Sequence, residues 1–103
     1  MARIDPATLL PAPRIRRAVL EGDVTQLHRG DRHAAEGDVF EIDGVSFEVV
    51  EVAEERLGDL TDADARAEGS PDLDAYRRRI EQTHDLEWND DDTAVLHRFE
   101  RQE

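Results

Sequence analysis

Two groups of side chains in this sequence have types and spacing suited to chemistry. His28, Asp31 and His33 lie close together, and two imidazoles with a carboxylate can bind a divalent metal ion. Their spacing matches no strong metal-binding signature, so we predict a polar loop and no metal site. Glu68 is the second candidate, because a carboxylate at a cleft edge can act as a general base or bind a ligand amine. The alternative for Glu68 is an exposed side chain at a helix end.

Other catalytic arrangements are excluded or disfavoured by composition. The chain has no cysteine, which excludes disulfides, thiol catalysis and Cys-based zinc sites. Its two serines are Ser46 and Ser70, and residues 44–48 lack the closing glycine of a nucleophile elbow. P-loop and Rossmann glycine patterns are absent, so we predict no cofactor. His97 alternates with Phe99 on a predicted strand, which favours a buried, hydrogen-bonded histidine over a catalytic one.

The net charge is strongly negative. In 103 residues the chain has 26 acidic and 13 basic side chains, and every basic one is arginine, giving a net charge of −13. High net charge with few aromatic residues is typical of disordered chains. The alternative is a folded protein adapted to high salt, in which self-repulsion is screened. Because the apolar residues are patterned, we expect the second, and with it a halophilic source.

The basic side chains are concentrated in the first third of the chain. Residues 1–35 hold six arginines against four acids, and residues 36–103 hold seven against 22 acids. An ordinary solvated surface is one interpretation of this asymmetry. The other is a phosphate-binding surface, since the guanidinium fork suits bidentate phosphate recognition. The arginines that this hypothesis assigns to phosphates are Arg16, Arg17, Arg29 and Arg32.

Local signals predict the secondary structure of the first half. Three prolines indicate an extended lead-in over residues 1–14. A short helix over 15–21 should end at Gly22, followed by a strand over 24–28 and a loop to residue 37. Asp43-Gly44 between two alternating segments, 39–42 and 45–49, is a strong hairpin signal. A change of alternation near Val50 predicts a β-bulge.

The second half is predicted to hold two helices and a strand. Thr61 is the expected N-cap of a helix ending at Gly69, and Ser70 that of a second helix reaching His84. An acidic loop over 85–92 surrounds Trp88, and residues 93–99 form the last strand. We therefore predict an α+β fold, a small β-barrel with short flanking helices, as a single domain over 15–103. No apolar run is long enough to span a membrane, so a cytoplasmic protein is expected.

Two of these segments resemble a known family. Residues 57–69, Leu-Gly-Asp-Leu-Thr-Asp-Ala-Asp-Ala-Arg-Ala-Glu-Gly, are similar to the signature of ASCH domains, the activating-signal-cointegrator homology family. Residues 20–26, Leu-Glu-Gly-Asp-Val-Thr-Gln, resemble part of the family pattern Leu-x-Gly-x-Lys-Thr-x-Thr. We call this pattern, and the matching residues of this chain, the upstream motif. The resemblance runs from Ile15 to Glu100. It implies a PUA-like fold with a ligand cleft between barrel and helices.

The resemblance also implies a ligand, either RNA or a modified nucleoside. Some bacterial relatives hydrolyse N4-acetylcytidine, and others are reported as ribonucleases. The hydrolases use a lysine and a threonine of the upstream motif together with the helix glutamate. Here Glu68 and Thr25 are retained, but Val24 stands at the lysine position and Leu27 at the second threonine. Since valine can neither accept a proton nor carry charge, enzyme activity is not expected.

Three functional hypotheses remain open at this stage. The favoured one is an RNA- or nucleotide-binding module in which Thr25, Gln26 and Glu68 line the cleft, the four arginines contact phosphates, and Trp88 or Tyr76 offers a stacking face. The rival is a small hydrolase using Glu68, Thr25 and His28. The third is a protein-interaction domain whose acidic part meets a basic partner. The sequence does not define an oligomeric state.

Overall fold

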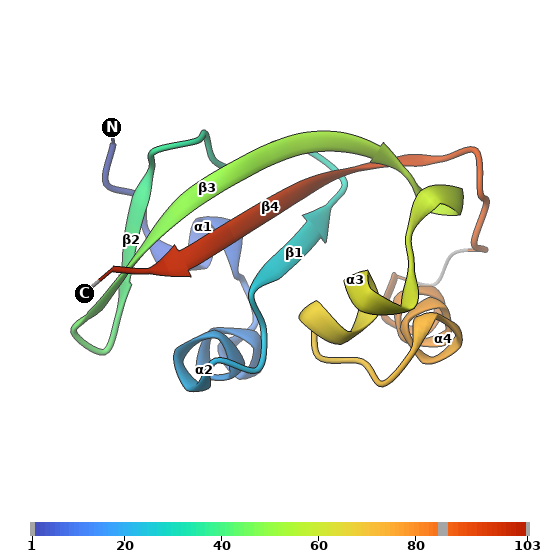
Figure 1. The fold of residues 1–103 in the computed structure, drawn as a ribbon, viewed down its shortest axis with the longest axis horizontal. Helices are drawn as coiled ribbons and strands as arrows, with labels where there is room; N and C mark the ends of the chain where they lie inside the picture. Colours follow the sequence, from blue (N-terminus) through green and yellow to red (C-terminus); the bar gives the residue numbers. More distant parts are fainter. Residues whose placement is uncertain (1, 85–86, 103) are drawn as a thin grey trace.

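A curled antiparallel sheet forms the body of the molecule (Figure 1). The computed structural model describes residues 2–84 and 87–102. Four strands pair in the order β1-β4-β3-β2 and make an open half-barrel. The strands are β1 (Gln26–Arg29), β2 (Val39–Ile42), β3 (Val45–Arg56) and β4 (Thr93–Arg101).

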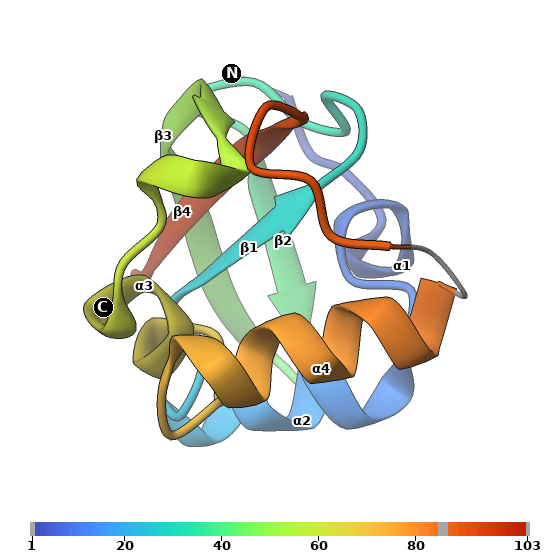
Figure 2. The same ribbon diagram turned by 90° about the vertical axis from the view of Figure 1, so that its right-hand side faces the viewer.

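Short helices cover the concave side of this sheet. In Figures 1 and 2, α2 and α4 both lie below the sheet, and α3 lies beside α4. The predicted α+β class is confirmed, with the barrel present as a half-barrel. The helices are α1 (Pro6–Leu9), α2 (Pro13–Glu21), α3 (Asp62–Ala67) and α4 (Leu73–His84), with a 3-10 turn at Leu57–Asp59.

The predicted hairpin and bulge are both confirmed. Asp43 and Gly44 have φ angles of 49° and 84°, the left-handed conformation that a tight two-residue hairpin turn requires. The pairing of β3 with β4 shifts register between Val49 and Glu51, where one extra residue enters β3. This bulge accompanies the bend of β3 over the concave face.

The first 14 residues differ from the extended lead-in that their prolines predict. Pro6–Leu9 forms one helical turn, because Asp5 caps it by accepting a hydrogen bond from the Ala7 amide, and Pro6 stands at a position where no amide donor is needed. Leu9 and Leu10 are completely buried in the sheet core. Pro13 then begins α2 for the same reason as Pro6, and Gly22 ends α2 as predicted.

The caps of the later helices are partly as predicted. Thr61 caps α3 in a reciprocal capping box with Asp64. The prediction that Ser70 caps α4 is wrong. The Asp72 side chain, just before the helix, accepts a hydrogen bond from the Ala75 amide at 2.8 Å, and Ser70 is buried. The predicted apolar face of α4 is confirmed by Leu73, Tyr76 and Ile80, while the side chain of His84 and residues 85–86 of the acidic loop lie outside the described residues.

Two separate apolar clusters stabilise the fold. The larger one lies under the sheet and includes Leu9, Leu10, Phe40, Val49 and Phe99. The smaller one joins α3, α4 and the last loop through Leu60, Ala65, Tyr76 and Trp88. Among the described residues no helix is long and apolar enough to cross a membrane.

Candidate functional site

Glu68 is a buried carboxylate with every oxygen engaged. Its side chain has no solvent exposure, which excludes the exposed helix-end alternative. Oε1 accepts the backbone N–H of His28 at 2.9 Å and the Tyr76 hydroxyl at 3.0 Å. Oε2 accepts His28 Nδ1 at 2.6 Å and Gln26 Nε2 at 3.2 Å. Four donors compensate a charge that would otherwise be very costly to bury.

Local structure brings these groups together from three elements. Gln26 and His28 are two residues apart on β1, so both side chains point to the same face of the sheet. Glu68 is the C-cap of α3, and the Thr25 amide donates to the Ala67 carbonyl at 2.8 Å, which fixes the helix end against β1. Tyr76 reaches the same carboxylate from α4.

The His28 ring lies between two carboxylates. Nδ1 is 2.6 Å from Glu68, and Nε2 is 2.7 Å from Oε1 of Glu55 on β3. Burial lowers the pKa of His28, but the hydrogen bonds and charges of Glu68 and Glu55 outweigh it, so the pKa is raised above 6.5. The two carboxylates therefore favour the imidazolium, the form that donates from both nitrogens.

Two neighbouring groups, Tyr76 and Asp64, also have shifted pKa values. Burial and the charge of Glu68 raise the pKa of Tyr76, which keeps its hydroxyl a neutral donor. Burial raises the pKa of Asp64, but its hydrogen bonds to Thr61 and Gln26 outweigh this and lower the pKa overall. Asp64 therefore stays a charged acceptor for the Gln26 amide, 3.3 Å away.

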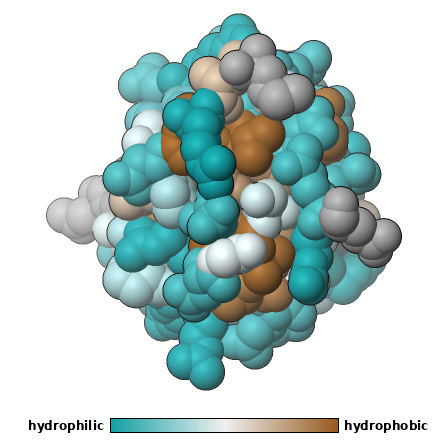
Figure 3. All heavy atoms as spheres, turned by 90° about the vertical axis from the view of Figure 1, so that its left-hand side faces the viewer, coloured by the Kyte–Doolittle hydropathy of each residue, from teal (hydrophilic) through white to brown (hydrophobic). Residues whose placement is uncertain are grey.

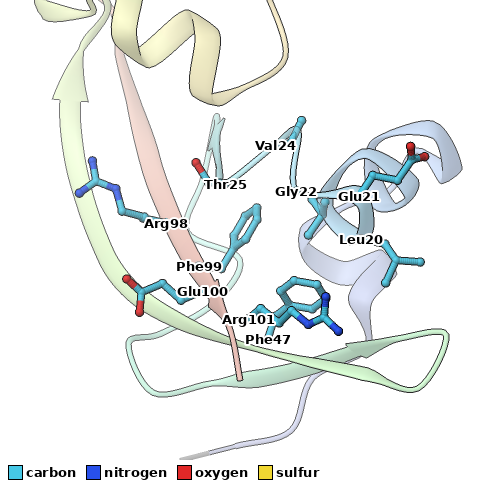
Figure 4. Close-up of a pocket in the computed structure, with 11 residues that line it drawn as sticks. Leu20, Glu21, Gly22, Val24, Thr25, Phe47, Arg98, Phe99, Glu100 and Arg101 are labelled. Carbon is cyan, nitrogen blue, oxygen red and sulfur yellow. The ribbon is translucent and has the colours of Figure 1, made fainter. Parts of the chain in front are cut away.

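A pocket of about 430 Å³ lies beside this cluster, under the sheet (Figure 4). The end of α2 and the upstream motif, with Gly22, Val24 and Thr25, form one wall. The end of β4 forms the other, with Arg98 and Arg101 among its side chains. Phe47 and Phe99 are nearly fully buried and make an apolar floor. We call this space the α2–β4 pocket.

Arg98 connects the pocket with the buried cluster. It pairs with Glu51 at 2.8 Å and lies 3.5 Å from Oε1 of Gln26, whose amide nitrogen donates to Glu68. Of the residues that the sequence hypothesis places in one cleft, Thr25 lines this pocket, whereas Gln26, His28 and Glu68 do not.

The four arginines predicted to contact phosphates do not converge on Glu68. Arg16 donates to the Leu10 carbonyl at 2.6 Å, and Arg29 donates to the Leu9 carbonyl at 2.7 Å. Arg32 donates to the Ala34 carbonyl, and Arg17 pairs with Glu21 on the exposed side of α2. Arg16 and Arg29 thus satisfy the free carbonyls at the end of α1.

The two predicted stacking rings are buried. Tyr76 and Trp88 are 3% and 8% exposed and pack edge to face with their centroids 6.2 Å apart. Arg77 lies over the Trp88 ring and Arg79 lies over the Tyr76 ring, so a guanidinium covers one face of each ring. Tyr76 therefore has almost no free surface to offer a base, and Trp88 borders only a hollow that is lined mostly by acidic side chains.

The residues of the predicted polar loop form no metal site. No cluster of three or more metal-ligating side chains occurs in the part of the chain that the structure describes. His28 faces Glu68, whereas the backbone N–H of His33 donates to Nε2 of His97 at 3.1 Å. His97 is completely buried, as its position on β4 predicts, but only its Nε2 accepts a hydrogen bond, and its Nδ1 has no partner among the described residues.

A second hollow lies on the other side of α2. It has a volume of about 450 Å³ and lies between α2 and the β2–β3 turn, with Leu20 and Ile42 among its lining residues. On the face that holds this turn, apolar side chains form patches between hydrophilic ones (Figure 3). Arg16 and Arg17 lie at this hollow, not at the α2–β4 pocket.

Solved structures with the same arrangement of elements identify the fold. An ASCH domain from Lactobacillus crispatus JV V101 aligns with a TM-score of 0.60 and 18% identity over 90% of this chain and 73% of that one. The fold is ASCH-like. A protein of family DUF984 from Enterococcus faecalis V583 aligns with a TM-score of 0.59 and 16% identity over 98% of this chain and 75% of that one. No family model matches the sequence, and no curated protein does.

The ASCH-like arrangement sets Val24 against the end of α3. A Cβ placed on Gly69 would lie 3.3 Å from Cγ2 of Val24, so the valine side chain fills the space beside the helix end. Sequence reasoning found Gln26, His28 and Glu68 but missed Glu55, Asp64 and Arg98. Glu55 and Arg98 lie in no motif, and Asp64 lies in the 57–69 segment without having been singled out, so strand register and helix packing bring the three to the site.

Proposed function

We propose that this ASCH-like chain binds RNA or a nucleotide-like ligand in the α2–β4 pocket. The observation that carries the proposal is the composition of that pocket, which combines two arginines and the Thr25 hydroxyl with an apolar floor beside the upstream motif. Its volume of about 430 Å³ is in the range of small-molecule sites. Similarity of fold to ASCH domains supports the choice of ligand as an analogy.

The pocket changes which arginines should contact the ligand. Arg98 and Arg101 line it, with the Arg98 guanidinium paired to Glu51, whereas Arg16 and Arg29 are bound to carbonyl groups of the N-terminal segment. Arg101 is exposed and stands at the end of β4, so its guanidinium can bind a phosphate or a base carbonyl. Glu21 and Glu100 also line the pocket, which favours a ligand that offers hydrogen-bond donors as well as acceptors.

The Arg101→Glu variant tests this site. Loss of one charge-assisted hydrogen bond should weaken binding of total RNA or a labelled nucleotide by about tenfold. Arg78→Glu is the matched control, because Arg78 is exposed on α4, does not line the pocket, and changes the net charge equally. Equal weakening by both variants, or no weakening by either, would contradict the assignment. Circular dichroism of each variant verifies that the fold is retained.

A hydrolase is the second candidate, favoured by one observation. Glu68 orients His28 through its Nδ1, the arrangement of a carboxylate-supported histidine base. Against it, the His28 side chain is only 2% exposed, and Nε2 is covered by Glu55. Incubation with N4-acetylcytidine, and separately with total RNA, distinguishes the two functions. Turnover that is lost in Glu68→Gln would overturn our preference for a binding module.

We further propose that the charge of −13 is an adaptation to high salt. Self-repulsion among 26 acidic side chains opposes folding in dilute buffer and is screened when the Debye length falls to about 3 Å near 1 M salt. Circular dichroism along a KCl series should therefore show complete folding only at high concentrations. A protein that is fully folded in dilute buffer would remove this proposal.

A further inference from the structure

The unit formed by α3 and α4 attaches to the sheet through a polar layer. The cluster of Leu60, Ala65, Tyr76 and Trp88 is separate from the apolar cluster under the sheet. Between the two lie the hydrogen bonds of Glu68 to β1 and the backbone contact of Thr25 with Ala67. We call this layer of side chains the seam; it comprises Gln26, His28, Glu51, Glu55, Asp64, Glu68, Tyr76 and Arg98.

His28 is at the centre of the seam. Both of its ring nitrogens face carboxylate oxygens, Glu68 on one side and Glu55 on the other, at 2.6 and 2.7 Å. An imidazolium can donate at both positions, but a neutral imidazole carries one N–H and can satisfy only one of them. Loss of the proton therefore leaves a lone pair facing a carboxylate at hydrogen-bond distance.

The other charged groups of the seam have hydrogen-bond or ion-pair partners other than His28. On β3, Glu51 is paired with Arg98 of β4 at 2.8 Å. At α3, Asp64 accepts the Thr61 amide at 3.0 Å and the Gln26 amide.

From α4, Arg79 donates to the backbone carbonyl of Glu68 at 3.2 Å and the Tyr76 hydroxyl donates to its carboxylate. None of these contacts places a second cation between Glu68 and Glu55. The proton on His28 is thus what balances the two carboxylates across the joint between helix and sheet.

We propose that protonated His28 clasps the α3–α4 unit to the sheet, and that loss of its proton loosens this unit while the sheet stays folded. Because the Thr25 amide is bonded to Ala67 and Val24 packs at Gly69, loosening also displaces one wall of the α2–β4 pocket. The device makes the shape of the pocket depend on pH and requires no ligand to operate.

The direction of the pH effect follows from the environment of His28. Its pKa is raised in the folded protein above the ordinary 6.5, because the two carboxylates outweigh burial. The stabilisation is therefore complete below pH 6.5 and is lost as the pH rises through the raised value.

Hydrogen exchange between pH 6 and pH 9, corrected for intrinsic rates, tests the clasp. Protection of amides in α3 and α4 should fall roughly tenfold over this range, as for the loss of one charge-assisted hydrogen bond, while the β2–β3 hairpin keeps its protection. An NMR titration of the His28 ring should show the same midpoint. Parallel loss in the hairpin, or no loss in α3 and α4, overturns the proposal.

Two variants separate the clasp from a general loss of stability. Glu55→Gln keeps an acceptor but removes one charge, so the midpoint of both measurements should move down by about one pH unit. Glu54→Gln is the matched control on the same strand, with its side chain exposed, and should leave the midpoint in place. A midpoint that is unchanged in Glu55→Gln, or shifted equally in both variants, overturns the proposal.

Discussion

The two ends of this molecule are held together by different forces. Under the sheet, Leu9, Phe40 and Phe99 bury apolar surface, a non-directional interaction that depends little on pH. At the seam, Glu68 and His28 are held by hydrogen bonds whose strength depends on which groups carry a proton. The core therefore sets the stability of the sheet, and the seam sets the conditions under which α3 and α4 stay attached to it.

Replacement of Glu68 tests the seam most severely. Glu68→Ala removes the acceptor of His28 Nδ1. It also leaves the Gln26 amide and the Tyr76 hydroxyl buried without their acceptor on Glu68. We expect a loss of about 3–5 kcal/mol in the free energy of unfolding. Urea titrations at pH 6 and pH 9 measure it, and the loss should be larger at pH 6, where His28 is charged. An equal loss of stability at both pH values would contradict the claim that the strength of the seam depends on the proton of His28.

Replacement of a core leucine provides the contrasting case. Leu9 is fully buried, so Leu9→Ala should cost about 3 kcal/mol through lost transfer energy and a cavity. This cost should be the same at pH 6 and pH 9, since no titratable group is involved. The same urea titrations decide it. A clear dependence on pH would show that the two regions are coupled more tightly than their separate apolar clusters indicate.

Removal of the Tyr76 hydroxyl should have a smaller effect. In Tyr76→Phe the apolar contacts remain and Glu68 Oε1 keeps the His28 amide as a donor. We expect a loss of about 1.5–3 kcal/mol in the free energy of unfolding, as for one hydrogen bond to a charged group. A phenylalanine variant as stable as the original protein would mean that the hydroxyl contributes nothing to the seam.

The two buried histidines should titrate in opposite directions. At His97 burial lowers the pKa, with His33 adding to the effect, and this outweighs its backbone hydrogen bonds, so the neutral form is favoured. His97 thus contributes stability above pH 6.5 that is lost as the pH falls, whereas His28 contributes stability below pH 6.5. NMR titration of the ring protons should place His28 above 6.5 and His97 below it. Equal midpoints would contradict the claim that the two histidines have pKa values shifted in opposite directions.

Local signals predicted much of the sheet and little of the seam. The Asp43-Gly44 turn, the bulge beside Val50 and the burial of His97 all follow from a few neighbouring residues. Glu68 lies 40 positions after His28, and no local pattern indicates that the two side chains meet. Its burial is a property of how α3 docks on β1, which only the fold reveals.

The arginines show a second limit of sequence reasoning. A cluster of guanidinium groups in the first third of the chain favoured phosphate contacts, yet Arg16 and Arg29 are used to satisfy carbonyls of Leu10 and Leu9. Those acceptors exist only because Pro6–Leu9 turns into a helix that three prolines seemed to exclude. A charge count records how many cations are present, but it does not record which of them are already bound.

The one-turn helix α1 has a consequence for any shortened form of the protein. Its leucines complete the core under the sheet. Two arginines, one from α2 and one from β1, donate hydrogen bonds to the carbonyl groups at its C-terminal end. A chain cut just before α2 would expose that core to water and leave both guanidinium groups without acceptors. The N-terminal segment therefore completes the core, and because Ala2 and Ile4 also hydrogen-bond to Val39 of β2, expression fragments or fusion junctions are best placed ahead of Ala2.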